Sequence, residues 1–429
     1  MNRDKKTAQS ILIALTISSI TWVMFLFIQR WFRLPSTSYP QYCVDLAWSF
    51  LHGRLDLMNA PLNGFDLSPY RGRVYAYWPP LTSICLIPLV KWHGPDKFPL
   101  RLFAMAVGAI NTGLTYLLID RLDYVFKKSM SVVWRVAFAL FLGWGTSNLV
   151  FSLVAGQWYV GQLTTLTFVL LALWAGLERD PQKRYRSALL SSVFYSLSVL
   201  GRSHLLLSFP IWLYLALSDE NFCLNFGDVK TKKIELLRNR GVFLTGGSLL
   251  LPVLTVVGLL LAYNAARFDR LFEFGLTYQN MGWFLWDDFK KYGLFHPYYI
   301  LKNIYFTVLR SPFVSYIDLS APTMGFSFFI QCPLFVFAIS SFFYGIYRQF
   351  AFWVWASVLL VCVPIFLSIG TGCGQFGARY LNDIAPFLVL LMFLRNKWVL
   401  SARVVVAGVF GIAFNLYGTL CLLKIIPFK

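Results

Sequence analysis

The sequence predicts an all-α, polytopic membrane protein with about 11 transmembrane helices and additional external helices along the membrane surface. Composition is the first reason. Hydrophobic residues make up 58% of the 429 residues and charged residues 13%, whereas soluble domains carry about 25% charged residues. The second reason is that long apolar runs recur along the whole chain. We therefore expect a single membrane-embedded domain that covers residues 1–429.

Basic residues set the predicted orientation of these helices. The first apolar run, Ile11–Ile28, follows Lys5 and Lys6 and is not followed by a cleavage site of small residues. We expect an uncleaved signal anchor with its N-terminus in the cytoplasm. Lys and Arg recur in short loops on that same side, so the net charge of +19 reflects topology. Nucleic-acid binding is not expected, because no part of the fold is free to present a basic face.

The remaining spans follow when the basic loops are placed in the cytoplasm. The run Ser187–Leu217 is too long for one span and is interrupted at Gly201–His204. Two short helices that meet at an external tip are therefore expected there. The other predicted spans are residues 11–28, 100–119, 134–154, 159–177, 241–263, 325–346, 352–369, 384–394 and 404–423.

Two large external regions, residues 30–99 and 264–323, carry most of the candidate chemistry. In the first region, Val44–Leu51 predicts a short amphipathic helix, and Leu81–Val90 is apolar but too short to span. We place both segments at the membrane surface. A membrane protein that keeps a large polar loop between its first two spans usually uses that loop.

Asp45 is the candidate catalytic residue of the first external region. A carboxylate near the membrane surface can remove a proton from an acceptor hydroxyl. The alternative interpretation is a solvated loop acid, and Asp56 and Asp66 are alternative bases on the same loop. The second external region holds the pair Asp287–Asp288, which we expect to be solvated.

Arg202 and Arg379 are the candidates for phosphate binding. Arg202 and His204 interrupt an apolar hairpin, where ionisable groups are costly and are functional by default, and a guanidinium suits an oxygen-rich phosphate. Arg379 and Tyr380 follow a glycine-rich stretch and open a helix just outside the membrane, where anion binding is favoured. The alternatives are snorkelling of Arg202 to the interface and a flexible turn at Arg379. We expect both arginines to face one external cavity.

No metal site or cofactor is expected. The phosphate-loop, dinucleotide, zinc-protease and nucleophile-elbow motifs are absent from the sequence, and its four His are scattered. No second acid lies within two residues of Asp45 to chelate a divalent ion. The seven Cys show no CxxC spacing and read as small buried hydrophobes. Cys43 and Cys373 both fall in external regions, so a disulfide between them stays an open alternative.

Five segments resemble, in order, the membrane glycosyltransferases of the C-type fold, the superfamily of protein O-mannosyltransferases and aminoarabinose transferases. The family's first-loop helix often begins with an Asp-Glu pair, where this chain has Tyr39-Pro-Gln-Tyr42 and keeps Asp45 one turn later. Trp78 stands where a Lys often precedes the Pro-Pro pair. The five segments are Val44–Asp56, Arg73–Leu81, Leu200–His204, Tyr263–Gly275 and Gln375–Pro386.

The resemblance implies an inverting hexosyl- or pentosyltransferase in the cell inner or plasma membrane. It would move a sugar from a polyprenyl-phosphate donor to a lipid, glycan or protein acceptor on the extracytoplasmic side. In this interpretation Asp45 is the base, and Arg202, Arg379 and Tyr380 bind the donor phosphate. Further candidates for substrate binding are His204, His52, Arg54, Tyr75, Arg267, Trp283 and Trp286.

Two other functions stay open at this stage. A transporter or flippase of lipid-linked sugars would need a cavity that reaches both sides and repeat symmetry, and the one-sided polar regions argue against it. A polymerase or ligase of lipid-linked glycans would share the external site. Within residues 264–323, Trp283 and Trp286 form either an interfacial aromatic belt or part of a mobile lid that selects the acceptor.

Overall fold

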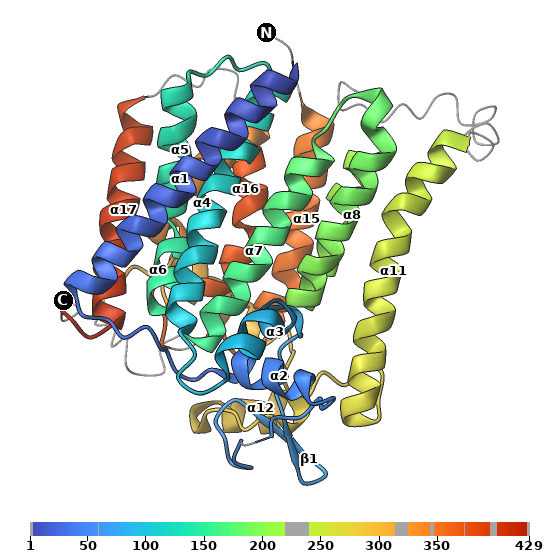
Figure 1. Cartoon of the computed structure of the whole chain (residues 1–429), viewed down its shortest axis with the longest axis vertical. Helices are drawn as coiled ribbons and strands as arrows, with labels where there is room; N and C mark the ends of the chain where they lie inside the picture. The colour runs from blue at the N-terminus through green and yellow to red at the C-terminus, as the bar shows by residue number, and fades with distance from the viewer. Residues whose placement is uncertain are drawn as a thin grey trace.

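The protein forms a bundle of long helices that run roughly side by side (Figure 1). One end of the bundle carries the short helices α2 (Tyr42–Leu51), α3 (Leu81–His93) and α12 (Trp286–Tyr292). We call it the loop end, and we call the opposite end, where the N-terminal helix α1 (Arg3–Trp31) begins, the basic end. The computed structural model describes residues 3–58, 60–218, 240–313, 325–343, 347–372, 374–394 and 401–426.

The all-α prediction is confirmed. Among the described residues, the strands are the antiparallel pair β1 (Ser68–Tyr70) and β2 (Arg73–Tyr75), whose turn residues Arg71 and Gly72 both have positive φ. A two-residue turn with positive φ at both positions matches the twist of a tight hairpin. The remaining α-helices are α4 (Leu100–Val125), α5 (Val132–Trp144), α6 (Ser147–Val154), α7 (Gln157–Gly176), α8 (Arg184–Gly201), α9 (Phe209–Leu217), α11 (Arg240–Phe268), α13 (Tyr299–Ile304), α14 (Phe328–Gln331), α15 (Arg348–Leu367), α16 (Ala385–Met392) and α17 (Ala402–Leu422).

The predicted count of about 11 spans is not confirmed. Six of the described helices, α1, α4, α7, α11, α15 and α17, are long and apolar enough to cross a membrane. A seventh span results if α5 and α6, which are bent by 53° at their junction, count as one. Other predicted spans are shorter or broken helices: α16 has 8 residues and follows a 3-10 turn. Apolar length alone does not distinguish a span from a short helix buried inside a bundle.

The predicted interruption at Gly201–His204 is present. Helix α8 ends at Gly201, Arg202 is extended, and a 3-10 helix, Ser203–Ser208, leads into α9. Part of the predicted basic loop, residues 219–239, the end of the second external region, residues 314–323, and Cys373 lie outside the described residues.

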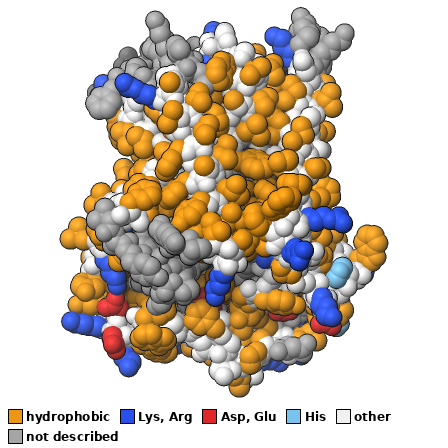
Figure 2. Space-filling model, turned by 90° about the vertical axis from the view of Figure 1, so that its left-hand side faces the viewer, with side chains coloured by type: hydrophobic (Ala, Val, Ile, Leu, Met, Phe, Trp, Pro, Cys, Tyr) orange, Lys and Arg blue, Asp and Glu red, His pale blue; other side chains and the backbone are white. Residues whose placement is uncertain are grey.

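The surface supports placement of the bundle in a membrane. On the face shown in Figure 2, hydrophobic side chains cover the middle of the molecule, and charged side chains gather toward its two ends. Side chains of helix α1 such as Leu12 and Val23 are more than half exposed. Exposure of so broad an apolar surface to water would be unfavourable, and such a surface is typical of contact with a membrane.

Helix α4 is the centre of the packing, because it contacts α1, α5, α6 and α7. Two glycines allow this close approach. A Cβ on Gly108 would lie 1.8 Å from the hydroxyl of Ser152 on α6, and a Cβ on Gly113 would lie 2.5 Å from the carbonyl of Ala14 on α1. Small residues at such contacts let membrane helices pack backbone to backbone.

A buried amide satisfies the backbone at the bend between α5 and α6. The side-chain nitrogen of Asn148 donates to the carbonyl oxygens of Gly108 and Gly143, each at 3.0 Å. The second carbonyl belongs to the last turn of α5, where helical partners run out. An apolar environment supplies no water to hydrogen-bond such a carbonyl. The Asn148 side chain therefore stabilises the bend by donating these hydrogen bonds.

Replacement of Asn148 by Ala should therefore lower the free energy of unfolding by about 1 to 2 kcal/mol, because the Gly143 carbonyl loses this donor, while the Gly108 carbonyl keeps the Thr112 hydroxyl as a donor. Unfolding in mixed detergent micelles measures this change. Ile110→Ala, on the exposed face of α4, is the matched control and should have a smaller effect. Equal effects of the two substitutions would show that the amide does not stabilise the bend.

Candidate active site

Two arginines that are far apart in sequence line one cavity at the loop end. Arg202 follows α8, and Arg379 begins the 3-10 helix Arg379–Ile384. The cavity, which we call cavity A, has a volume of about 550 Å³. Arg202 and Arg379 therefore line one cavity, as predicted, while the external position of this cavity and phosphate binding by the two arginines stay predictions. An apolar part of its wall consists of Leu206, Leu207, Phe295, Pro364 and Ile365.

The carboxylate of Asp383 fixes two of the predicted residues. It accepts hydrogen bonds from Nε of Arg202 at 2.8 Å and from Nε2 of His204 at 3.0 Å, and Nη2 of Arg202 lies 2.6 Å away. The Asp383 side chain is 4% exposed. A carboxylate so engaged orients the guanidinium and offsets its charge, so Asp383 is a positioning residue. The sequence prediction missed it, although it lies one helical turn after Arg379.

Arg379 is buried and has few partners of its own. The residue is 6% exposed, and its Nε has no hydrogen-bond partner among the described residues. Its guanidinium carbon lies 5.1 Å from the centre of the Tyr380 ring, which also lies 5.4 Å from the guanidinium carbon of Arg202. Gly372 makes room, since a Cβ there would lie 2.6 Å from the Arg379 Nε. A desolvated guanidinium with an unused donor is suited to bind an anion.

A second cavity, cavity B, adjoins the first and contains a carboxylate. Its volume is about 570 Å³. Asp66 lines it, and the two carboxylate oxygens accept hydrogen bonds from Nε1 of Trp158 at 2.8 Å and from Nε2 of Gln279 at 2.7 Å. Burial raises the pKa of Asp66, and these two hydrogen bonds and the charge of Arg379 oppose that rise. A carboxylate with a raised pKa beside a cavity is a candidate base.

Cavities A and B share a wall, which includes Tyr77, Trp158, Arg379 and Tyr380. Burial, and then the charge of Asp66, raises the pKa of Tyr77 well above its usual value, so its hydroxyl stays protonated and can donate. The sequence prediction named Tyr75 and missed Tyr77 and Trp158.

The first turn of α7 assembles this wall. The backbone N–H of Cys43 donates to the side chain of Gln157 at 2.7 Å, Trp158 donates to Asp66, and the hydroxyl of Tyr159 donates to the carbonyl of Gly374 at 2.7 Å. Three consecutive residues at the start of α7 thus each form a hydrogen bond with a segment that is distant in sequence.

Asp45 does not line cavity A or cavity B among the residues that the structure describes. Its side chain is exposed. The surrounding protein, and secondly the charge of Asp96, nevertheless raise the pKa of Asp45 to about 6. Rotation about the axis of α2 explains the placement, because the neighbouring Cys43 and Leu46 point into cavity A. The structure therefore does not bring Asp45 together with Arg202 and Arg379.

Four other predicted residues of the loop end also lie away from both cavities and make contacts of their own. Nδ1 of His52 is 2.9 Å from the carbonyl oxygen of Trp48, and Arg54 forms an ion pair with Asp56. The buried side chain of Tyr75 packs edge-on against Phe268, with ring centres 5.2 Å apart.

Arg267 is a structural residue. It is 3% exposed, its Nη1 donates to the carbonyl of Ala76 at 2.6 Å, and its guanidinium stacks on Tyr263 with 3.9 Å between guanidinium carbon and ring centre. It ties the end of α11 to the segment that carries Tyr77. We correct its assignment from substrate binding to support of that segment.

Trp283 and Trp286 are exposed and do not line either cavity among the described residues, although Gly282, Phe284 and Leu285 line cavity B. The segment around them is thus a wall of cavity B, and its role as a moving lid stays a prediction. Lys302 forms an ion pair with Asp288 at 3.0 Å.

No group of three or more His, Cys, Asp or Glu side chains that could hold a metal ion occurs among the described residues. Cys43 is buried and free, and its predicted alternative partner Cys373 lies outside the described residues. Known protein-family models, curated proteins and solved structures contain no match to this chain. The resemblance to C-type glycosyltransferases therefore stays an expectation.

The contact between Asp383 and Arg202 should show strong coupling. Loss of one partner of a buried ion pair typically costs about 3 to 5 kcal/mol of stability, because the other charge stays buried. We expect Asp383→Asn and Arg202→Gln each to destabilise the protein, and the double variant to be less destabilised than the sum. Unfolding measurements over the full double-mutant cycle test this, and additivity within about 0.5 kcal/mol would refute the coupling.

Proposed function

We propose that the protein is a membrane glycosyltransferase that moves a sugar from a polyprenyl-phosphate donor to an acceptor, with inversion at the anomeric carbon. One observation carries the proposal: the buried Arg379, whose Nε has no hydrogen-bond partner among the described residues, stands in the wall between an apolar-walled cavity and a cavity lined by the half-buried carboxylate of Asp66. A lipid phosphate and an acceptor hydroxyl are the groups that this pair of cavities suits.

Cavity A is the proposed donor site. Arg379 and Arg202 bind the phosphate, and Tyr380, which packs against both guanidinium groups, holds them in place. The apolar wall formed by Leu206, Leu207 and Ile365 accepts the first isoprene units. A flat guanidinium matches phosphate oxygens better than an ammonium does, and a dry site strengthens the attraction.

Cavity B is the proposed acceptor site, and Asp66 is the proposed base. The acceptor oxygen forms a bond to the anomeric carbon while the bond from that carbon to the phosphate oxygen breaks. The hydroxyl proton passes to Asp66, and the electron pair leaves on the polyprenyl phosphate, which the two arginines stabilise. A phosphate leaves without protonation, so one carboxylate suffices, unlike the two that glycosidases use.

The distribution of Lys and Arg indicates which side of the membrane the loop end faces. We propose that the loop end faces the extracytoplasmic side of the inner or plasma membrane, because the loops of the opposite end are rich in Lys and Arg. The acceptor is a lipid, glycan or protein hydroxyl that reaches cavity B.

Substitution of the base tests the proposal. Asp66→Asn keeps the size of the side chain and removes its basicity, so turnover with polyprenyl-phosphate sugars should fall by at least about a hundredfold. Asp45→Asn is the matched variant, since Asp45 was the base predicted from sequence. A large loss with Asp45→Asn and none with Asp66→Asn would return the role to Asp45. Absence of turnover with every such donor in the unmodified protein, correctly folded, would overturn the function.

The pH dependence of turnover gives a second test. Asp66 acts only when deprotonated, so the rate should rise with pH through a pKa above the ordinary value of about 4. Trp158→Phe removes a hydrogen bond that favours the charged carboxylate, so the acidic limb should move to higher pH. Trp286→Phe, outside the cavities, is the control and should leave the limb in place. A limb that does not move with Trp158→Phe would exclude Asp66 as its origin.

A further inference from the structure

A third cavity lies at the basic end, away from the candidate active site. Its volume is about 750 Å³, and it is lined by α1, α4, α5, α7 and α8. Helices α1 and α8 form its two outer walls, since α1 packs on α4 and α8 packs on α7. Ile11 on α1 and Leu190 on α8 line the cavity and are partly exposed. The cavity therefore opens between two helices that face the bilayer.

Cations outnumber anions in this cavity. Among the residues that the structure describes, five Lys and Arg and three carboxylates line it. The carboxylates are engaged: Asp120 and Asp123 pair with Arg135, and Glu178 accepts from Arg121 at 2.8 Å. The two remaining cations of the lining that belong to α1 and α8, Lys6 and Arg186, are exposed. The described lining of the cavity therefore carries an excess of positive charge.

Two buried donors in the cavity wall lack a partner. The Tyr116 side chain is fully buried, and its hydroxyl has no hydrogen-bond partner among the described residues. The same holds for Nε of Arg135, whose side chain is 18% exposed. A buried polar group without a partner costs about 1 to 3 kcal/mol. Both groups are donors, so an oxygen-rich acceptor is the chemistry that would satisfy them.

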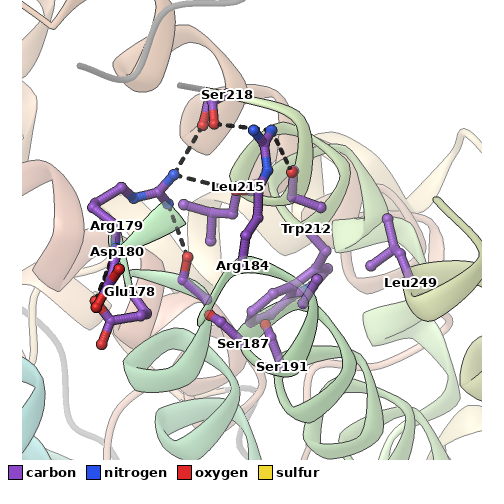
Figure 3. Close-up of a pocket in the computed structure, with 13 residues that line it drawn as sticks. Glu178, Arg179, Asp180, Arg184, Ser187, Ser191, Trp212, Leu215, Ser218 and Leu249 are labelled. Carbon is purple, nitrogen blue, oxygen red and sulfur yellow. Dashed lines mark hydrogen bonds between the residues drawn. The ribbon is translucent and has the colours of Figure 1, made fainter. Parts of the chain in front are cut away.

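A neighbouring cavity shows the contrast. In the smaller space of about 270 Å³ drawn in Figure 3, Arg179 and Arg184 point toward Ser218 at the end of α9. Arg179 donates to the carbonyl of Gly176 at 2.8 Å, and Arg184 donates to the carbonyl of Leu217 at 3.0 Å. These guanidinium groups satisfy helix C-termini, where cations are favoured. These two guanidinium groups have partners within the fold, whereas the Tyr116 hydroxyl and Nε of Arg135 have none among the described residues.

We propose that the larger cavity binds the phosphate-bearing head group of an anionic phospholipid. The phosphate oxygens accept from the Tyr116 hydroxyl and from Nε of Arg135, while Lys6 and Arg186 supply attraction at the mouth. The first methylenes of the lipid lie against the apolar wall, which includes Ile13, Leu117 and Trp174. Basic pockets between membrane helices on the cytoplasmic side are suited to such head groups. The proposal does not depend on glycosyl transfer.

Tyr116→Phe is a sharp test, because it deletes only the hydroxyl. That hydroxyl has no hydrogen-bond partner among the described residues, so its removal should not destabilise the fold. Native mass spectrometry of the full-length protein, titrated with phosphatidylglycerol, should show one tightly retained lipid. Tyr116→Phe should weaken its retention about tenfold, since a hydrogen bond to a charged group contributes that much. Tyr185→Phe, on the exposed surface of α8, is the matched control and should retain it.

Two further experiments decide whether the bound phosphate belongs to a lipid or is free inorganic phosphate. Phosphatidylcholine should be retained less than phosphatidylglycerol, and Arg186→Gln should reduce that preference while Arg348→Gln, at the same end but outside the cavity, should not. Inorganic phosphate at millimolar concentration should fail to displace the lipid. Full displacement by inorganic phosphate, equal retention of both lipids, or unchanged retention by Tyr116→Phe would each overturn the proposal.

Discussion

Burial of two guanidinium groups at one end of an apolar bundle is the constraint on which the loop end depends. Removal of a charge from water costs several kcal/mol even after relaxation. Arg202 meets this cost with Asp383, and that contact joins the α8–α9 hairpin to the segment before α16. Arg379 has aromatic faces around it and an unused Nε. An arrangement that compensates one arginine fully and leaves its neighbour available is suited to a ligand that brings its own negative charge.

The two external regions fold into one structure around this pair. Residues 30–99 and 264–323 are separated by most of the bundle in sequence. Yet Asp66 donates its N–H to the carbonyl of Asn280 at 3.0 Å, and Asn280 donates to the carbonyl of Leu67 at 2.8 Å. The side chain of Gln279 closes the same contact, and Arg267 makes another at Ala76. The wall between the two cavities therefore depends on both regions, and the first turn of α7 anchors it to the bundle.

Sequence reasoning reached the class of fold and part of the site. Apolar runs and basic loops were sufficient to predict an all-α membrane protein, and the polar interruption inside an apolar hairpin identified Arg202. Sequence reasoning could not decide which of Asp45, Asp56 and Asp66 is the base. Asp45 has the motif position, but the rotation of a ten-residue helix decides which side it faces. Asp66, an alternative in the sequence analysis, is favoured over Asp45 through its contacts with Trp158 and Gln279, which are 92 and 213 positions away.

The predicted span count is not confirmed, for a related reason. Hydropathy measures how apolar a segment is, but the length of a helix inside a bundle depends on what it packs against. Helix α16 is almost wholly buried and needs no full membrane length to satisfy its side chains. Asp383 was within reach of the sequence, since an acid one turn after a buried arginine is a natural partner for a second cation.

We propose that Arg379 binds the phosphate of a polyprenyl lipid, and phosphorus NMR of a short-chain polyprenyl phosphate, titrated with the purified protein in detergent, tests this most directly. We expect a saturable shift of the phosphate signal that Arg379→Gln abolishes and that Arg54→Gln, at a side chain that does not line either cavity, preserves. A shift that survives Arg379→Gln unchanged, in a protein that remains folded, would contradict phosphate binding by Arg379.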